Sequence, residues 1–251
     1  MIFILRLARL AAVSPLLVAC SAPVTTADAA APVDATTKQI LIEEYGDSTT
    51  VGYTATPSGT IIAAMNQPNT LQRLLRTEYG DRVVVKNEGI GGIQSSDALN
   101  GTDGIHQSWE SVMAKSHAQI VTLNFGLGDA YLFSRPESGK ISASPQEYKR
   151  VMGELVRIAR EHGKTVVIYE PNPSCHPARE TGMPYYVMHL DQLGHEMNIP
   201  IASQFWALLA TPNWRELLSD CTHPTPELYQ LKGENAYKVL RPIVKQIIDA
   251  S

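Results

Sequence analysis

The chain has 251 residues, of which 44% are hydrophobic and 18% are charged. This is the composition of an ordinary globular protein, and it excludes a disordered chain, a collagen-like fibre and a multi-span membrane protein. The formal net charge is -4, so no basic surface argues for a nucleic acid partner.

The first segment of the chain has the pattern of a targeting signal. Arg6 and Arg9 precede an apolar run at 10–19 that is too short for a transmembrane helix, which needs roughly twenty residues. The run ends in the sequence LVAC at Cys20, which resembles the lipobox of bacterial lipoproteins, where the peptidase cuts before an acylated cysteine. We therefore predict a lipoprotein signal peptide at 1–19 and lipidation of Cys20. The alternative is an ordinary signal peptide with a cysteine near its cleavage site.

The segment at 20–37 consists mostly of Ala, Pro, Thr and Asp, which cannot build a core, so we predict a flexible tether there. Acyl chains on Cys20 would attach the protein to a membrane without spanning it. By the sorting rule that the lipoprotein resemblance implies, Ser21 favours the outer membrane. The expected location is the bacterial cell envelope, on the periplasmic face, with a folded domain at 38–251.

From residue 38 onward, short runs rich in β-branched residues alternate with longer segments of helical periodicity. The predicted strands lie at 39–45, 83–87, 119–125, 165–169 and 200–202, and the predicted helices at 70–79, 95–115, 145–162, 184–197 and 226–249. Buried strands between helices indicate an α/β fold, with a parallel sheet covered on both faces. In such sheets the functional residues follow the carboxyl ends of the strands.

Two of these places carry residues suited to nucleophilic catalysis. Ser48 follows the first predicted strand and a Gly-Asp turn, although a serine there is also a common helix N-cap. His223 lies three residues after Asp220, so the carboxylate can orient the imidazole and leave Nε2 to take a proton from a hydroxyl. The alternative for this pair is a histidine at a helix start with an aspartate cap.

Two glycine-rich turns complete the pattern. Gly89, Gly91 and Gly92 follow the second strand, and the sequence GLGD at 126–129 follows the third. In this order the four blocks resemble the SGNH (GDSL-type) hydrolase family, from about residue 39 to the C-terminus. The resemblance implies a three-layer α/β/α sandwich with a flavodoxin-like parallel sheet. It also implies an esterase or other acyl hydrolase that uses no metal and no organic cofactor.

The resemblance also implies roles for individual residues. Ser48 is the expected nucleophile, His223 the general base and then acid, and Asp220 the residue that orients His223. The amides of Ser48 and Gly92 are the expected oxyanion donors. The third oxyanion position is Gly128, where the family has an asparagine whose side chain donates as well.

Loss of one such donor costs about 2.7–4 kcal/mol of transition-state stabilisation, and three consequences of Gly128 stay open. Another side chain can replace the donor, with Asn124 and Asn87 nearest in sequence. The hydrolase can be slow, or the protein can bind a substrate without turnover. A glycine also leaves room near the acyl carbon, so Gly128→Asn either raises the rate or, if the space is needed, lowers it.

Cys175 and Cys221 are the cysteines that remain after lipidation of Cys20. In an oxidising compartment a disulfide between them would hold the turn that carries Asp220 and His223. Two unrelated thiols are the alternative.

The predicted function is a serine esterase that hydrolyses carboxylic esters of small acyl or O-acetyl groups through an acyl-enzyme. The expected partners are a small-molecule or carbohydrate ester and a membrane. An acyltransferase with the same triad and a weakly active substrate-binding lipoprotein are the alternatives. A flavodoxin-like nucleotide binder is disfavoured because the first turn has no glycine-rich phosphate loop. Loops at 53–60 and 131–144 are expected to form pocket walls.

Overall fold

A computed structural model describes residues 39–250. The predicted signal peptide at 1–19, the predicted lipidation site Cys20 and the predicted tether at 20–37 lie outside these residues. Within 39–250, none of the helices combines the length and the apolar character that crossing a bilayer requires.

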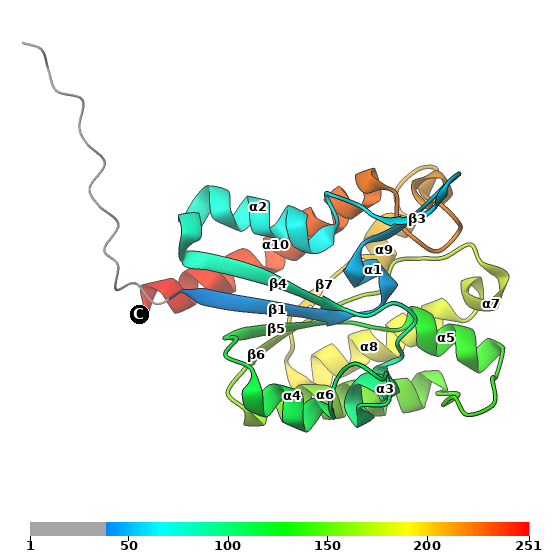
Figure 1. Ribbon diagram of the computed structural model, residues 1–251, viewed down its shortest axis with the longest axis horizontal. Coiled ribbons are helices and arrows are strands. Elements are labelled where there is room, and N and C mark those ends of the chain that lie inside the picture. The colour runs from blue at the N-terminus through cyan, green and yellow to red at the C-terminus, as the bar shows by residue number, and fades with distance from the viewer. Residues whose placement is uncertain (1–38, 251) are drawn as a thin grey trace, which may run out of the picture. The chain divides into compact units, whose positions relative to one another are not determined.

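A five-stranded parallel sheet runs through the centre of the described chain (Figure 1). Its strands are β1 (Ile40–Gly46), β4 (Val83–Gly89), β5 (Ile120–Asn124), β6 (Thr165–Tyr169) and β7 (Ile201–Ala202). They lie side by side in the order β4-β1-β5-β6-β7, and neighbouring strands are parallel. Counting only these strands along the chain, the order is the 2-1-3-4-5 order of flavodoxin-like folds. The predicted fold class is therefore confirmed.

Helices cover both faces of this sheet (Figure 1). One face is covered by α2 (Gln67–Tyr79) and α10 (Pro226–Asp249), and the other by α3 (Ser95–Asn100), α4 (Trp109–Lys115), α6 (Pro145–Glu161) and α8 (Met183–Met197). Successive strand residues point to opposite faces, so Ile120 packs in one apolar cluster and Val121 in the other. This alternation is why the buried strands are apolar along their whole length.

Shorter elements form the connections. They are α1 (Ser48–Val51), the hairpin of β2 (Tyr53–Thr56) and β3 (Gly59–Ile62), η1 (Gly80–Arg82), α5 (Leu127–Ser134), α7 (Pro177–Glu180), α9 (Phe205–Leu209) and η2 (Trp214–Leu217). The expected loop at 53–60 is therefore a hairpin. The expected helix at 95–115 is two helices, because Gly101 ends α3 in the left-handed conformation at φ +70°.

Two glycines at strand ends allow α1 to pack directly against the sheet. A Cβ on Gly46 would lie 2.2 Å from Thr50 Oγ1, and a Cβ on Gly89 would lie 2.5 Å from the Val51 amide nitrogen. No side chain fits at either place. The close packing fixes Ser48 at the carboxyl edge of the sheet.

Candidate active site

Ser48 is the first residue of α1, and Asp47 caps that helix. The Asp47 carboxylate accepts hydrogen bonds from the amide and the hydroxyl of Thr49, both at 2.9 Å. The alternative in which Ser48 is the N-cap is therefore wrong. Because Asp47 satisfies the first turn of α1, the Ser48 hydroxyl is available to another partner.

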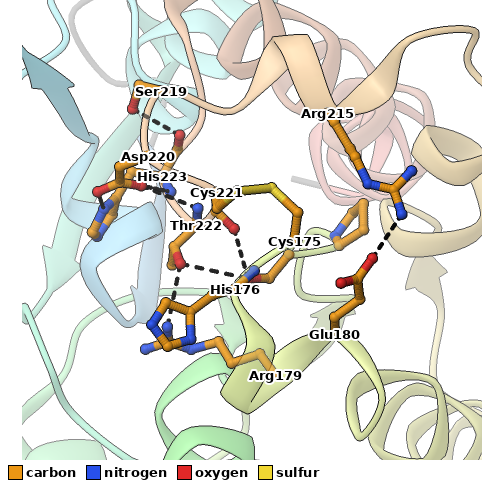
Figure 2. Close-up of a disulfide and its surroundings, with 12 residues drawn as sticks. Cys175, His176, Arg179, Glu180, Arg215, Ser219, Asp220, Cys221, Thr222 and His223 are labelled. Atoms are coloured by element: carbon orange, nitrogen blue, oxygen red, sulfur yellow. Dashed lines mark hydrogen bonds and ion pairs between the residues drawn. A yellow bond between two sulfur atoms is a disulfide. The ribbon is translucent and has the colours of Figure 1, made fainter.

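That partner is His223, which lies 175 residues further along the chain. The imidazole Nε2 lies 2.9 Å from Ser48 Oγ, and Nδ1 lies 2.7 Å from Asp220 Oδ2. The other Asp220 oxygen accepts the amides of Thr222 at 3.0 Å and His223 at 2.7 Å (Figure 2). The expected nucleophile, base and orienting acid are thus connected in one hydrogen-bonded chain.

The electrostatics of Asp220 suit an orienting role. Partial burial raises the pKa of this carboxyl, but the hydrogen bonds from the amide and imidazole of His223 outweigh burial, and the pKa lies below its usual range. Asp220 is therefore ionised at neutral pH and holds a proton on Nδ1. Nε2 is then the nitrogen that can accept a proton from Ser48.

The turn that carries Asp220 and His223 is held by a disulfide. Cys175 and Cys221 are bonded, with their Cα atoms 4.7 Å apart, and the Cys175 amide donates to the Cys221 carbonyl at 2.9 Å (Figure 2). Cys221 has φ +65°, a left-handed conformation that costs free energy for any residue except glycine. The disulfide and the hydrogen bond from the Cys175 amide hold the turn in this backbone conformation.

The expected oxyanion donors are two backbone amides. The amides of Ser48 and Gly92 make no hydrogen bond within the described residues 39–250, so both N–H groups are available. Gly92 has φ +78°, which a side chain would disfavour.

Gly128 lies against the same glycine-rich turn. A Cβ on Gly128 would lie 2.7 Å from the carbonyl oxygen of Ile93. The expectation that Gly128 leaves free space is therefore wrong, since the backbone of the β4–α3 turn fills the space beside its Cα. A side chain at this position requires the turn to move.

Neither asparagine considered as a replacement donor is free. Asn124 Nδ2 donates to the hydroxyls of Thr50 at 3.2 Å and Thr49 at 3.4 Å. Asn87 Nδ2 donates to the carbonyls of Thr50 at 2.9 Å and Val51 at 3.3 Å. Both side-chain amides bond to residues of α1, so neither replaces the asparagine that the family resemblance implies at position 128.

A buried lysine that was not predicted links the two segments of the site. Lys232 of α10 is fully buried, and its Nζ donates to Asn172 Oδ1 at 3.0 Å and to Thr49 Oγ1 at 3.4 Å. Asn172 Nδ2 in turn donates to the carbonyl of Thr222 at 3.0 Å. Burial lowers the pKa of Lys232 to about 8, although nearby carboxylates oppose this. The lysine therefore connects the residue after Ser48 with the residue before His223.

The sequence did contain a signal for this lysine. Lys232 stands at i+4 spacing between Leu228 and Ala236, and all three are on the buried face of α10. A charge inside a buried stripe must have polar partners. Arg179 of α7 was not predicted either, although its Nη1 donates to the Thr222 hydroxyl at 3.2 Å. It had no such signal, because it follows a Pro-rich connection in which a charge is unremarkable.

The first predicted pocket wall contacts the expected base His223, and the second contacts His176, the residue after Cys175. The Tyr53 ring of β2 meets the His223 imidazole edge-on, with centroids 6.2 Å apart. Tyr131, from the second predicted wall, meets the His176 ring in the same way at 5.8 Å. A cavity of about 570 Å³ at the opposite, amino-terminal edge of the sheet holds none of them. In the described part of the chain, no group of three or more His, Cys, Asp or Glu residues is arranged to hold a metal ion.

Comparison with known proteins gives one family. The model of the GDSL-like lipase/acylhydrolase family matches residues 45–231. No match was found among the curated proteins. The fold is similar to the lipase/acylhydrolase from Enterococcus faecalis, with 19% identity, a TM-score of 0.63 and coverage of 81% of this chain and 96% of that chain.

Two further solved structures are similar. The M. smegmatis aryl esterase has 18% identity and a TM-score of 0.64, covering 81% of this chain and 99% of that chain. An acetylxylan esterase from Geobacillus stearothermophilus, solved as a catalytic mutant, has 18% identity and a TM-score of 0.64, covering 81% of this chain and 94% of that chain. At these identities the similarity shows the fold.

Proposed function

The chain belongs to the GDSL-like lipase/acylhydrolase family and is a carboxylic ester hydrolase, and we propose that Ser48 is its nucleophile. The observation that carries this proposal is the 2.9 Å contact between Ser48 Oγ and His223 Nε2, backed by Asp220. A serine hydroxyl becomes a useful nucleophile only when an adjacent base takes its proton. This contact provides such a base.

In the proposed reaction, His223 takes the proton of Ser48 as Oγ attacks the ester carbonyl. The imidazolium then gives that proton to the leaving alcohol, and an acyl-enzyme remains. His223 then takes a proton from water, which attacks the acyl-enzyme, and the imidazolium returns that proton to Ser48 Oγ as the acid leaves. Asp220 stabilises the imidazolium in both halves of the reaction.

The oxyanion of each tetrahedral intermediate would meet the amides of Ser48 and Gly92. Both amides lack another partner within 39–250, which supports this assignment. Without a side-chain donor at Gly128, the enzyme is expected to be slower than relatives that have asparagine there, by roughly 10²–10³-fold if nothing compensates. We therefore favour a slow hydrolase over a protein that only binds substrate.

For the substrate we propose carboxylic esters with a small acyl group, O-acetyl groups on carbohydrate included. The support is that the fold neighbours include an aryl esterase and an acetylxylan esterase. An acyltransferase would use the same acyl-enzyme and pass the acyl group to a sugar hydroxyl. Product analysis with an added sugar acceptor separates the two: free acid indicates hydrolysis, and a newly acylated sugar indicates transfer.

Replacement of the nucleophile tests the proposal. Ser48→Ala should reduce hydrolysis of p-nitrophenyl acetate to the background rate and abolish labelling by a fluorophosphonate probe, because no hydroxyl remains to attack. Ser58→Ala, which removes an exposed serine from the β2–β3 hairpin, is the matched control and should keep both. Turnover or labelling that persists in a folded Ser48→Ala protein would disprove the assignment.

We also propose that the protein is a lipoprotein of the bacterial cell envelope, anchored through Cys20 at the periplasmic face of the outer membrane. The LVAC sequence that ends at Cys20 supports this. Cell fractionation with palmitate labelling tests it. The natural chain should be labelled and sediment with outer membranes, and a Cys20→Ala chain should do neither.

A further inference from the structure

Arg179 of α7 places a guanidinium beside the proposed triad. Its Nε donates to the Leu127 carbonyl at 2.9 Å, and its Nη1 donates to the Thr222 hydroxyl at 3.2 Å. Leu127 precedes Gly128, and Thr222 precedes His223. Figure 2 shows the Arg179 side chain reaching toward Thr222 from the α7 side, below the turn of Asp220 and His223. The guanidinium therefore contacts both the start of α5, which carries Gly128, and the turn that carries His223.

This cation has no bonded counter-ion. Arg179 is only partly exposed, yet within residues 39–250 it forms no salt bridge, and its Nη2 group makes no hydrogen bond there. Burial lowers its pKa, which the more distant charges of Asp47 and Asp220 oppose. An arginine stays protonated nevertheless. A desolvated charge held only by neutral acceptors gains free energy when an anion binds it.

The side chain is also held in a fixed plane. The guanidinium carbon lies 4.7 Å from the centre of the Tyr131 ring, which is close enough for a cation–π contact. Two of the five guanidinium N–H groups are used on Leu127 and Thr222, so three are left on Nη1 and Nη2. Two neighbouring N–H groups of this kind match the two oxygens of a carboxylate.

Within residues 39–250, no acid lies within ion-pair distance of Arg179, and Asp47 and Asp220 act on it only from further away. Burial, followed by the charges of Arg179 and Arg135, lowers the pKa of His176, although Asp220 opposes this. His176 is thus neutral at pH 7. Arg215, by comparison, is an ordinary surface arginine: it stacks on Trp214 at 4.6 Å and pairs with Glu180 at 2.6 Å.

We propose that Arg179 narrows the range of small acyl groups given above by binding a carboxylate on the acyl part of the ester, so that half-esters of dicarboxylic acids are preferred over esters with an uncharged acyl group such as acetyl. This inference rests on the proposed function. The leaving alcohol must depart beside His223, its proton donor. The Leu127 anchor lies next to the expected oxyanion position Gly128, so the proposed carboxylate is on the acyl part; a carboxylate on the leaving alcohol, nearer the Thr222 anchor, is an outcome that the test distinguishes.

The test compares two esters that differ only at the end of the acyl chain. Mono-4-nitrophenyl glutarate carries a carboxylate where 4-nitrophenyl valerate carries a methyl group. We expect the natural protein to prefer the glutarate ester in kcat/KM, after spontaneous hydrolysis has been subtracted. In Arg179→Met the glutarate-to-valerate ratio should fall about 10–100-fold, as for a lost charge-assisted hydrogen bond. Arg179→Lys should keep part of the preference, and Arg215→Met, the matched control, should keep all of it.

Several outcomes would overturn the inference. They are a natural protein without preference for the glutarate ester, equal losses on both esters in Arg179→Met, and a preference found only when the carboxylate is on the leaving alcohol. Free glutarate should also inhibit valerate hydrolysis competitively in the natural protein and not in Arg179→Met. Absence of that inhibition alongside normal fluorophosphonate labelling would overturn the role of Arg179 and leave the esterase proposal intact. Absence of labelling and of all hydrolysis would overturn both.

Discussion

Gly128 is the residue at which this chain departs from the pattern of its family, and the departure involves more than one missing side chain. The carbonyl oxygen of Ile93 lies only 2.7 Å from where a Cβ at position 128 would be. The glycine and the close approach of the β4–α3 turn therefore belong together. A single reversion to asparagine restores the donor but not the turn geometry that would accommodate it.

We therefore expect Gly128→Asn to lower the rate. Overpacking against backbone should destabilise the protein by about 1–3 kcal/mol, and displacement of the Ile93 carbonyl should shift the adjacent Gly92 amide, with a loss of about tenfold in kcat. Steady-state kinetics and urea unfolding measure the two effects. Gly182→Asn is the control, because Gly182 has a right-handed helical backbone at φ −83° and ψ −36°, and a Cβ there meets nothing closer than 3.8 Å. A faster Gly128→Asn enzyme would contradict this account.

At the scale of elements, the short turn from Ser219 to Thr225 carries half of the site. Its backbone is pinned where Ser219 donates to the His223 carbonyl at 2.8 Å, and Cys221 is bonded to Cys175. The left-handed conformation of Cys221 makes the turn dependent on these constraints.

Removing the disulfide should therefore affect catalysis as well as stability. A Cys175→Ala, Cys221→Ala double variant should lose about 2–4 kcal/mol of unfolding free energy. Its kcat for p-nitrophenyl acetate should also fall, measured at a temperature where circular dichroism shows the variant to be folded. Unchanged kcat in the folded variant would mean that the turn holds Asp220 and His223 without the cross-link.

Helix α10 contributes through Lys232, which joins the nucleophile turn to the histidine turn. Lys232→Met removes the buried cation and leaves Asn172 Oδ1 without its donor, so we expect about a tenfold fall in kcat. KM should change less than kcat, because Lys232 is not exposed to substrate.

Lys238→Met on the same helix is the control, since Lys238 is exposed and, among residues 39–250, bonds only to Asn235 at 3.1 Å. If Lys232→Met kept normal kcat, the connection through Asn172 and Thr49 would be structural and would not position the catalytic residues.

The ends of several elements could be predicted because the sequence marks them locally. The strand at 165–169 and the helix at 226–249 have the predicted bounds, the helix because Thr225 caps it and Pro226 starts it. The β2–β3 hairpin was expected as a loop, since its stability comes from contacts to distant residues. One of these is the bond from the Tyr229 hydroxyl to the Tyr53 carbonyl at 2.7 Å.

At the scale of the whole molecule, the sheet topology brings together residues that are far apart in sequence. That Ser48 and His223 share the carboxyl edge followed from the strand pattern. The hydrogen bonds that support these two residues could not be predicted in this way. Lys232, Asn172 and Arg179 bond to partners more than forty residues away in sequence, and no local motif encodes such partners.

The same burial that builds the site leaves acids inside the molecule, and this makes stability depend on pH. Burial raises the pKa of Glu44 to about 7, although the Tyr169 hydroxyl and Lys232 oppose this, and burial raises the pKa of Asp129 to about 6. Both values lie above those of the unfolded chain, so between about pH 4 and pH 7 the folded state binds more protons than the unfolded state. The stability that these groups contribute is complete below the unfolded pKa and is lost as pH rises through the folded pKa.

The free energy of unfolding should therefore be lower at pH 7.5 than at pH 5, by about 3–4 kcal/mol, because Glu44 and Asp129 together contribute nearly three pKa units over this interval. Urea titrations at the two pH values measure this. Glu44→Gln, whose amide oxygen can still accept the Tyr169 hydroxyl, should remove about half of the difference, because it cannot ionise. Glu227→Gln, at an exposed position, should retain the whole difference. Two results would show that Glu44 is not the group that titrates: a free energy of unfolding that rises between pH 5 and pH 7.5, or a decrease in Glu44→Gln as large as in the natural protein.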